Sequence, residues 1–251
     1  MIVLRNRLIT VLTFNNGVLF RTRNFQPDYR YTANFVDLWG IDEIVILDIT
    51  RPGQGDRQLF YDVVRKFSEN CFVPIAAGGN VTSVDEIKTL LRSGADKVVI
   101  NTGAVKNPGF ITMASQLFGS QCIVISIDAK IIGDATYETF ISFGTEATGL
   151  HPAKWARKAQ EYGAGEIMIT SIDKDGSLEG YDNALNKMVS EAVDIPVLVC
   201  GGAGKWQDFV DGFIEGKASA VCTTNIYHFT EISIKSAKKY LESSGIAVRN
   251  Q

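Results

Sequence analysis

An internal repeat constrains this chain more than any other feature. The segment VPIAAGGN at residues 73–80 recurs as IPVLVCGGAG at residues 195–204. Gly78 and Gly201 lie 123 residues apart (201 − 78), and segments flanking each copy keep this offset. A repeat at half the length of a 251-residue chain indicates two matching halves of one fold, rather than a solenoid of short units.

Each copy of the repeat has the pattern of a βα unit. A short apolar run is followed by a glycine turn and then by a helix with a polar start. Eight such units close into a ring at about 250 residues. We therefore predict an α/β protein with a (β/α)8 TIM barrel, two-fold pseudo-symmetric half-barrels and a single domain over residues 1–251. The strands are expected near residues 8–13, 43–48, 74–77, 97–101, 123–128, 166–172, 196–200 and 220–224.

The clearest helix is expected over residues 83–94, which begin with a Ser cap and two acids and end in Gly. Two stretches, 14–31 and 130–149, are long for barrel loops, and long loops at the carboxyl ends of the strands usually shape the active site. The alternating pattern over residues 137–143 predicts a small hairpin in the second one. Weaker helical patterns cover residues 155–162, 206–215 and 231–243.

Composition excludes several classes of protein. A net charge of −3 gives no basis for nucleic-acid binding. The apolar stretch at the N-terminus is too short for a signal peptide, and no apolar run approaches the ~18 residues of a membrane helix. We expect a cytoplasmic protein without a metal or cofactor. The four cysteines lack metal-type spacing and are expected to be reduced thiols: Cys71, Cys122, Cys200 and Cys222.

The glycine turns predict two phosphate sites. Loops after barrel strands commonly hold phosphate with backbone N–H groups. Two sites on opposite sides of the barrel mouth would suit an elongated ligand with a phosphate at each end. Glycines that only form tight turns are the alternative, but their occurrence in both halves favours phosphate. The expected residues are Gly78, Gly79, Asn101 and Thr102 in the first half and Gly201, Gly202, Thr224 and Asn225 in the second.

Acidic residues at the carboxyl ends of predicted strands are candidates for catalysis or substrate binding, since barrel enzymes place such groups at this edge. Asp128 ends the fifth strand, and Asp48 ends the second. Solvated loops or Asx turns are the alternative for each of them. The segment after the sixth strand adds a loop that could order over a ligand, with Asp173, Asp175, Gly176 and Ser177.

Four charged residues begin predicted strands at the opposite end of the barrel. Each alone could be a solvated charge, but together they provide two cations and two anions. Buried charges must pair, so a ring of compensating salt bridges could close the barrel floor. A charged floor in place of an apolar plug suggests that something passes through it. The residues are Arg7, Glu43, Lys97 and Glu166.

Neither histidine suggests catalysis. His151 begins a helix, and His228 in an aromatic segment is expected to be a packed side chain. No Ser-His-Asp or Cys-His order and no metal cluster is visible in the sequence.

In combination, these motifs resemble the cyclase subunit of imidazole glycerol phosphate synthase (HisF) over essentially the whole chain. The resemblance implies a (β/α)8 lyase that pairs at its floor with a HisH-type glutaminase. Ammonia would cross a charged gate, matched by the four floor residues, and attack a bis-phosphorylated substrate at the mouth. Asp96 matches a position that contacts the glutaminase. The matching segments are residues 47–50, 94–98, 121–124, 127–130, 163–167, 170–176 and 201–204.

The chain departs from the family at one of its two catalytic aspartates. The second is kept as Asp128, but the first is replaced by Thr13, which cannot ionise. Arg21 keeps a basic residue in the loop after strand one, while Asn80 replaces a third glycine of the phosphate turn. Cys200, before the second Gly-Gly pair, resembles the sequence of paralogues of this subunit from lipopolysaccharide and other surface-polysaccharide pathways. The resemblance implies a subunit that supplies ammonia to a separate sugar amidotransferase.

Three hypotheses follow from this departure. The first is a paralogue that serves amidino-sugar synthesis. The second is a genuine cyclase of histidine biosynthesis that tolerates Thr13, and the third is a non-catalytic scaffold that activates the glutaminase.

Overall fold

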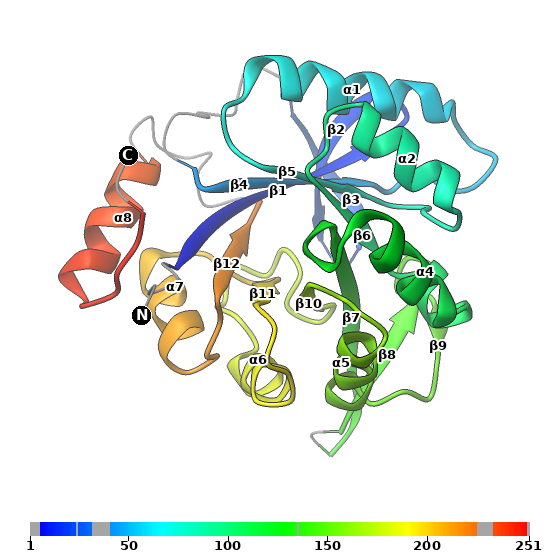
Figure 1. Ribbon diagram of the computed structural model, residues 1–251. Coiled ribbons are helices and arrows are strands. Elements are labelled where there is room, and N and C mark those ends of the chain that lie inside the picture. The colour runs from blue at the N-terminus through cyan, green and yellow to red at the C-terminus, as the bar shows by residue number, and fades with distance from the viewer. Residues whose placement is uncertain (1–5, 24, 32–40, 135, 225–232, 250–251) are drawn as a thin grey trace.

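A computed structural model describes residues 6–23, 25–31, 41–134, 136–224 and 233–249. Within these residues, eight parallel strands close into a barrel in the order β10-β11-β12-β1-β4-β5-β6-β7, and β7 pairs with β10 to complete it (Figure 1). The predicted (β/α)8 barrel is confirmed, and each of the eight expected strands is present. Their bounds are β1 (Arg7–Asn15), β4 (Glu43–Asp48), β5 (Ile75–Gly78), β6 (Lys97–Ile100), β7 (Ile123–Gly133), β10 (Glu166–Ser171), β11 (Val197–Cys200) and β12 (Ala220–Thr223).

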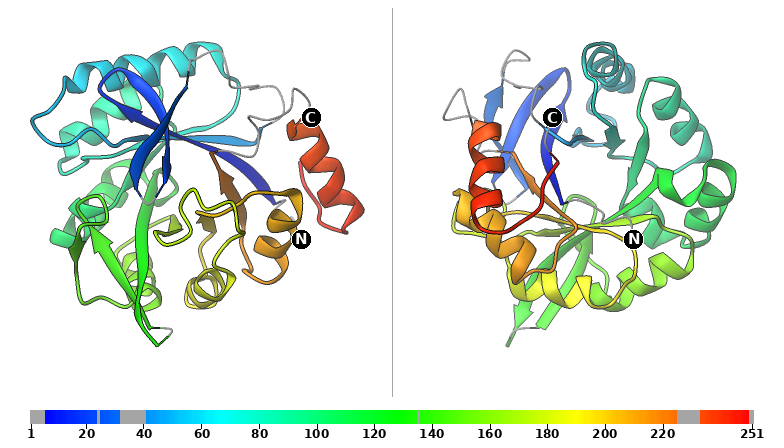
Figure 2. Two further views of the ribbon diagram at one scale, coloured as in Figure 1. Left: turned by 180° about the vertical axis from the view of Figure 1, so that it is seen from behind. Right: turned by 60° about the vertical axis from the view of Figure 1, so that its left-hand side comes forward.

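The helices surround the barrel, as the views in Figures 1 and 2 show together. The helix expected over residues 83–94 is α2, and it begins as predicted, because Ser83 and Glu86 form a reciprocal capping box. None of the described helices has the length and apolar composition needed to cross a membrane. The helices are α1 (Arg57–Asn70), α2 (Val84–Arg92), α3 (Thr102–Lys106), α4 (Gly109–Phe118), the 3-10 turn η2 (Ser120–Cys122), α5 (Pro152–Glu161), α6 (Asn183–Ser190), α7 (Trp206–Ile214) and α8 (Ser233–Ser243).

The long stretch over residues 14–31 contains two strands that the sequence did not predict. Strand β1 runs past the barrel to Asn15 and pairs antiparallel with β2 (Val18–Arg23), which pairs in turn with β3 (Gln26–Tyr31). Asn16 and Gly17 form the two-residue turn, with φ of 44° and 88°. An Asn-Gly pair between two strands is a strong hairpin signal, because both residues tolerate positive φ.

The hairpin expected near residues 137–143 is confirmed. Strand β7 extends beyond the barrel and pairs antiparallel with β8 (Thr136–Ile141), which pairs with the short β9 (Glu146–Ala147). Both hairpins therefore extend barrel strands at their carboxyl ends, where β1 and β7 leave the ring.

The barrel strands bury side chains on both faces, as parallel strands do. One face packs under the helices in a large cluster that includes Leu8, Ile44 and Ile167. The other face fills the inside of the barrel. This inner cluster consists of Ile9, Val11, Val45, Ala76, Val99, Val124, Met168, Leu198, Ala220 and Cys222.

At the glycine turns, the structural equivalence of the two halves differs by one residue from the alignment of their Gly-Gly pairs. Strands β5 and β11 end at Gly78 and Cys200, and the next residues, Gly79 and Gly201, both adopt positive φ, 96° and 93°. Gly79 is therefore the structural counterpart of Gly201. Aligning the Gly-Gly pairs as letters hid this shift, because the first-half strand itself ends in glycine.

Candidate active site and barrel floor

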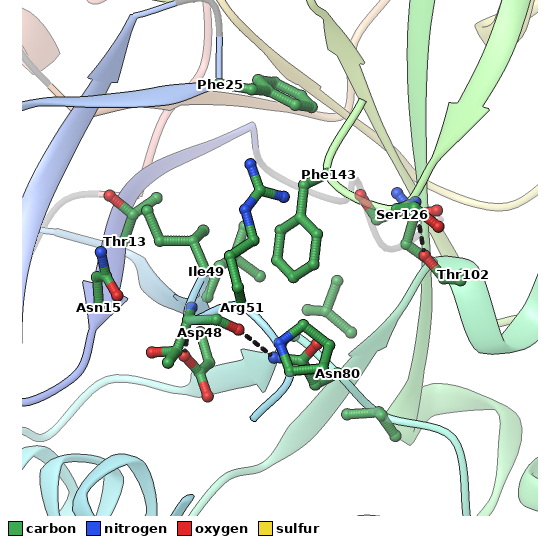
Figure 3. Close-up of a pocket in the computed structure, with 18 of the residues that line it drawn as sticks. Thr13, Asn15, Phe25, Asp48, Ile49, Arg51, Asn80, Thr102, Ser126 and Phe143 are labelled. Carbon is green, nitrogen blue, oxygen red and sulfur yellow. Dashed lines mark hydrogen bonds between the residues drawn. The ribbon is translucent and has the colours of Figure 1, made fainter. Parts of the chain in front are cut away.

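A pocket of about 840 Å³ opens at the carboxyl ends of the barrel strands (Figure 3). Four predicted residues reach it from four different strands or strand ends: Thr13, Asp48, Asn101 and Asp128. Thr102, Asp175 and Thr224 also line it. The structure therefore brings much of the predicted site together at the mouth, where barrel enzymes place their chemistry.

Asp128 is the most perturbed acid of this pocket. Its side chain accepts a hydrogen bond from Asn101 Nδ2 at 2.7 Å and one from Ser126 Oγ at 3.4 Å. Burial raises the pKa of Asp128 to about 7, the two hydrogen bonds oppose this rise, and the charge of Asp175 adds to it. A carboxyl group with a pKa near neutrality can serve as a general acid or base.

Thr13 lies in β1, paired with Leu47 of β4 and Phe20 of β2, and only 6% of its surface is exposed. It lines the same pocket as Asp128. Figure 3 shows Thr13 on one side of the pocket and Ser126, from the strand of Asp128, on the other. The position that would carry the first carboxylate thus faces the pocket, but it holds a hydroxyl.

The phosphate turn of the first half has a tightly fixed backbone. A Cβ on Gly79 would lie 2.1 Å from the carbonyl oxygen of Asp48, so glycine is required there. Asn80 follows with a φ of 55°, and its Nδ2 donates to the carbonyl oxygen of Thr50 at 2.9 Å. Asn80 therefore ties the turn to the β4–α1 loop, a contact that a third glycine could not make.

Asp48 lines the pocket at the end of β4, and its carboxylate is engaged by neighbouring groups. Its carboxylate accepts from the backbone N–H of Thr50 at 2.9 Å and forms an ion pair with Arg57 Nη1. Arg57 Nη2 also donates to the carbonyl oxygen of Gly79 at 2.5 Å. Asp48 and Arg57 together hold the β4–α1 loop against the phosphate turn.

The second-half turn is almost closed. A cavity of about 20 Å³ lies between Gly201, Gly202, Gly176 and Thr224. Gly201 and Gly202 have φ of 93° and 109°, as expected of glycines that are required by the backbone. A cavity of this size holds about one water molecule and not a phosphate.

The β2–β3 hairpin covers this second turn. Thr22 Oγ1 and the N–H of Phe25 donate to the carboxylate of Asp175 at 3.1 and 2.9 Å. Burial raises the pKa of Asp175, and these two hydrogen bonds oppose that shift. The carbonyl oxygen of Thr22 also lies close over Gly176. The hairpin and the Asp175 loop therefore form one packed unit over the second turn.

Several predicted site residues do not line either cavity. Gly78 lies within β5 against Val99, Asp173 accepts from the N–H of Ile131 at 2.9 Å, and Ser177 Oγ accepts from the N–H of Glu179 at 3.3 Å. Arg21 lies in β2, where the structure describes the backbone and not its side chain. Asn225 and His228 lie outside the described residues.

Sequence reasoning missed four residues at the mouth: Phe25, Arg51, Arg57 and Phe143. They come from the β2–β3 hairpin, the β4–α1 loop, the start of α1 and the β8–β9 turn. Loop residues have no periodicity that would place them, so only Arg57 carried a signal, as the first residue of a helix after an Asp cap.

At the other end of the barrel, the four predicted charges meet in one closed ring. Arg7 pairs with Glu43 at 2.6 Å and with Glu166 at 2.9 Å. Lys97 pairs with Glu43 at 2.8 Å and with Glu166 at 2.9 Å. Burial disfavours the charge of Arg7, but the two glutamates outweigh it and raise the pKa of Arg7. Each cation therefore bridges both anions.

The ring lies on the same strand face as the inner cluster, because Arg7, Ile9, Val11 and Thr13 alternate along β1. An axis through the barrel thus meets charges, then apolar side chains, and then the pocket. Asp96 is exposed beside the floor, and its carboxylate accepts from the N–H of Ile75 at 2.8 Å.

Across the described part of the chain, no group of three His, Cys, Asp or Glu side chains is arranged to hold a metal ion. All four cysteines are free thiols.

Comparison with known proteins agrees with this architecture. A family model described as histidine biosynthesis protein matches residues 10–233. The imidazole glycerol phosphate synthase subunit HisF of Alkaliphilus metalliredigens (strain QYMF) is 46% identical over 253 residues, which cover 98% of this chain and 100% of that protein. The chain therefore belongs to the histidine biosynthesis protein family, and it is HisF-like over nearly its whole length.

Proposed function

We propose that this chain receives ammonia from a HisH-type glutaminase at the barrel floor and delivers it to a phosphorylated ligand at the mouth. The observation that carries the proposal is the closed ring of Arg7, Glu43, Lys97 and Glu166. Replacing buried ion pairs by packed apolar side chains is often neutral or stabilising, so stability alone does not call for such a ring. A ring of ion pairs can, however, open by exchanging partners, as a gate must.

The space above the ring supports the same role. The inner cluster includes the small side chains Ala76 and Ala220 among larger apolar ones. Ammonia is small and uncharged, so it can cross an apolar interior that would exclude ammonium and most other solutes. The path would end at the pocket that holds Asp128.

The surface around the ring is suited to a protein partner. Phe72 lies in the loop before β5, at the floor end of the barrel, and 94% of its surface is exposed. Exposed aromatic side chains are frequent anchors of protein interfaces. With the exposed Asp96 nearby, Phe72 is a candidate contact for the glutaminase.

The pocket supports a bis-phosphorylated small molecule as the ligand, with one phosphate at Gly79, Asn101 and Thr102 and the other at Gly201, Gly202 and Thr224. For the second site, the β2–β3 hairpin has to move, because the cavity there is about 20 Å³.

Thr13 favours a paralogue that supplies ammonia to amidino-sugar synthesis for surface polysaccharides, with a sugar amidotransferase as a further partner. The two-carboxylate scheme of a cyclase lacks one member here, which typically costs about 10²–10⁴ in rate. Four free thiols fit a cytoplasmic location.

A second candidate is a genuine imidazole glycerol phosphate synthase cyclase, and one observation favours it. Asp175 lies near enough to raise the pKa of Asp128 by its charge, so a second carboxylate is present in the pocket despite Thr13. The 46% identity to a HisF subunit points the same way.

The two candidates are separated by ammonium-dependent turnover of the bis-phosphorylated ribonucleotide substrate by the purified chain. The paralogue predicts a rate about 10²–10⁴ below that of an authentic cyclase. A comparable rate would establish the cyclase instead. A chain that stimulates glutaminase without transferring ammonia to any acceptor would be a scaffold.

A further inference from the structure

Among the described side chains at the rim of the pocket, one cation is not paired with an acid. Arg51 lies in the β4–α1 loop and lines the pocket. The other described cations of this rim are compensated, since Arg57 pairs with Asp48, and Lys106 pairs with Glu146 at 3.4 Å. Among the residues that the structure describes, no carboxylate forms an ion pair with Arg51. Its charge is therefore available to an anionic ligand.

Phe143 holds this cation in place. The Arg51 guanidinium carbon lies 4.0 Å from the centroid of the Phe143 ring, and Figure 3 shows the two side chains next to each other in the pocket. Stacking on an aromatic ring occupies the face of a guanidinium and leaves its N–H edge free for a bidentate contact. A guanidinium that is already ordered loses less side-chain entropy when it binds a ligand.

The turn that carries Phe143 is itself held in an unusual conformation. Ser142 and Phe143 both have positive φ, 53° and 62°, which residues with a side chain rarely adopt. The N–H of Ser142 donates to Thr102 Oγ1 at 3.0 Å, and Thr145 Oγ1 donates to the carbonyl oxygen of Ser142 at 2.6 Å. Thr102 belongs to the first phosphate site, so that site and the Phe143 turn are directly linked.

Arg51 also lies beside the first phosphate turn. Asn80 Nδ2 donates to the carbonyl oxygen of Thr50, the residue before Arg51. Arg57, further along the same loop, donates to the carbonyl oxygen of Gly79. The loop that carries Arg51 is therefore fastened to the turn at two points.

The first site has a need for such a cation. The backbone N–H groups of Thr82 and Ser83 at the start of α2 are not available to a phosphate, because they donate hydrogen bonds to Glu86 Oε2 at 2.7 and 3.1 Å. Glu86 also lines the pocket and adds a negative charge. A positive side chain strengthens the binding of a dianionic phosphate placed there, because it offsets the charge of Glu86.

We propose that Arg51, positioned by Phe143, is a specificity-determining residue of the first phosphate site. Its N–H edge contacts the phosphate group of the ligand and selects a phosphorylated end over a neutral hydroxyl. The inference rests on the proposed function only in assigning one end of a bis-phosphorylated ligand to this site.

Calorimetric titration of the full chain with inorganic phosphate, and with ribose 5-phosphate against ribose, tests this assignment. We expect Arg51→Ala to weaken binding of both phosphate probes on the order of ten- to a hundred-fold, as befits a lost charge-assisted contact. Arg51→Lys should recover part of the affinity, since lysine keeps the positive charge but cannot make the bidentate contact of a guanidinium. Phe143→Leu should weaken phosphate binding several-fold, whereas Phe143→Tyr should keep the wild-type affinity, because only an aromatic ring stacks on Arg51. If Phe143 only stabilised the turn, binding would not depend on an aromatic ring at this position.

Lys106→Ala is the matched control, because it removes the same charge from the same rim where Glu146 already compensates it. If Arg51→Ala binds phosphate as tightly as the wild type, backbone groups hold the phosphate and the assignment is wrong. If Lys106→Ala loses as much affinity as Arg51→Ala, the overall positive potential of the pocket explains the effect, and the assignment is also wrong. Absence of phosphate binding in the wild type would overturn both this inference and the phosphate part of the proposed function. Failure of ammonia transfer alone would leave the Arg51 assignment standing.

Discussion

At the scale of single residues, Asp128 combines burial with the loss of its expected catalytic partner. Its pKa is raised to about 7 from an ordinary value of 3.8, chiefly because the carboxyl group is desolvated. Near neutral pH the side chain therefore exchanges a proton readily, which is the property that acid/base chemistry on a phosphorylated ligand needs.

This shift makes a prediction about stability. Between about pH 4 and pH 7 the folded chain holds a proton on Asp128 that the unfolded chain has released, so this group lowers the free energy of unfolding as pH rises through that window. The side chain of Asp128→Asn cannot ionise. The free energy of unfolding of this variant, relative to that of the wild type, should therefore rise by on the order of a few kcal/mol between pH 4.5 and pH 7.5. Denaturant unfolding of both proteins at the two pH values measures this, and a difference that does not change with pH would show that the pKa of Asp128 is ordinary.

A second residue-scale prediction concerns Thr13. Thr13→Asp restores a carboxylate that faces the pocket from β1. We expect ammonium-dependent cyclase turnover to rise by about ten-fold or more over the wild type, short of the full 10²–10⁴, because Asn80 and the covering hairpin stay unchanged. Asp128→Asn in the same background should remove the gain. A wild-type rate that already matches an authentic cyclase would leave Thr13→Asp nothing to restore, and the paralogue assignment would be wrong.

At the scale of elements, the barrel strands were predictable, whereas the way the loops meet over the mouth was not. The eight barrel strands follow from continuous apolar runs, because each buries both faces. The β1–β2 hairpin was missed although the Asn16-Gly17 turn between the two strands signalled it. Arg51 and Phe143 depend on how two loops meet in space, which no local pattern encodes.

The hairpin also makes a prediction at this scale. Thr22→Val keeps the shape of the side chain but removes its hydrogen bond to Asp175. With one of its two tethers gone, the Asp175 loop should open more often. Hydrogen exchange at the amide of Phe25, which donates to the same carboxylate, should become faster. Thr89→Val in α2 is the control, since its hydroxyl bonds only within that helix; unchanged exchange at Phe25 in Thr22→Val would mean that other contacts hold the hairpin.

At the scale of the whole molecule, the barrel separates two ends that differ in chemistry. The floor end carries the ring of charges and the exposed Phe72, and the mouth carries the pocket with Asp128. The inner cluster lies between them. This polarity could be read from the sequence, because strand starts and strand ends map to opposite ends of a parallel barrel.

The partner surface makes a prediction at this scale. Phe72→Ala should weaken binding of the glutaminase by about ten-fold or more, if this side chain is an anchor of the interface. Ile132→Ala near the end of β7 removes an exposed apolar side chain at the opposite, mouth end of the barrel and should leave binding unchanged. Equal affinities for Phe72→Ala and the wild type, measured by calorimetry or surface plasmon resonance, would place the docking surface elsewhere.

The central claim is that ammonia passes through the ring, and Lys97→Ala tests it most directly. This change leaves Glu43 and Glu166 each without one cation, which strongly perturbs a buried ring. The experiment compares the rates of product formation from glutamine and from ammonium in the complex with the glutaminase. All variants carry Thr13→Asp, which raises turnover. Lys88→Ala, which removes a surface charge, is the control. We predict that Lys97→Ala lowers the glutamine-dependent rate several-fold relative to the ammonium-dependent rate while glutaminase binding is kept. An unchanged ratio of the two rates would contradict passage through the ring.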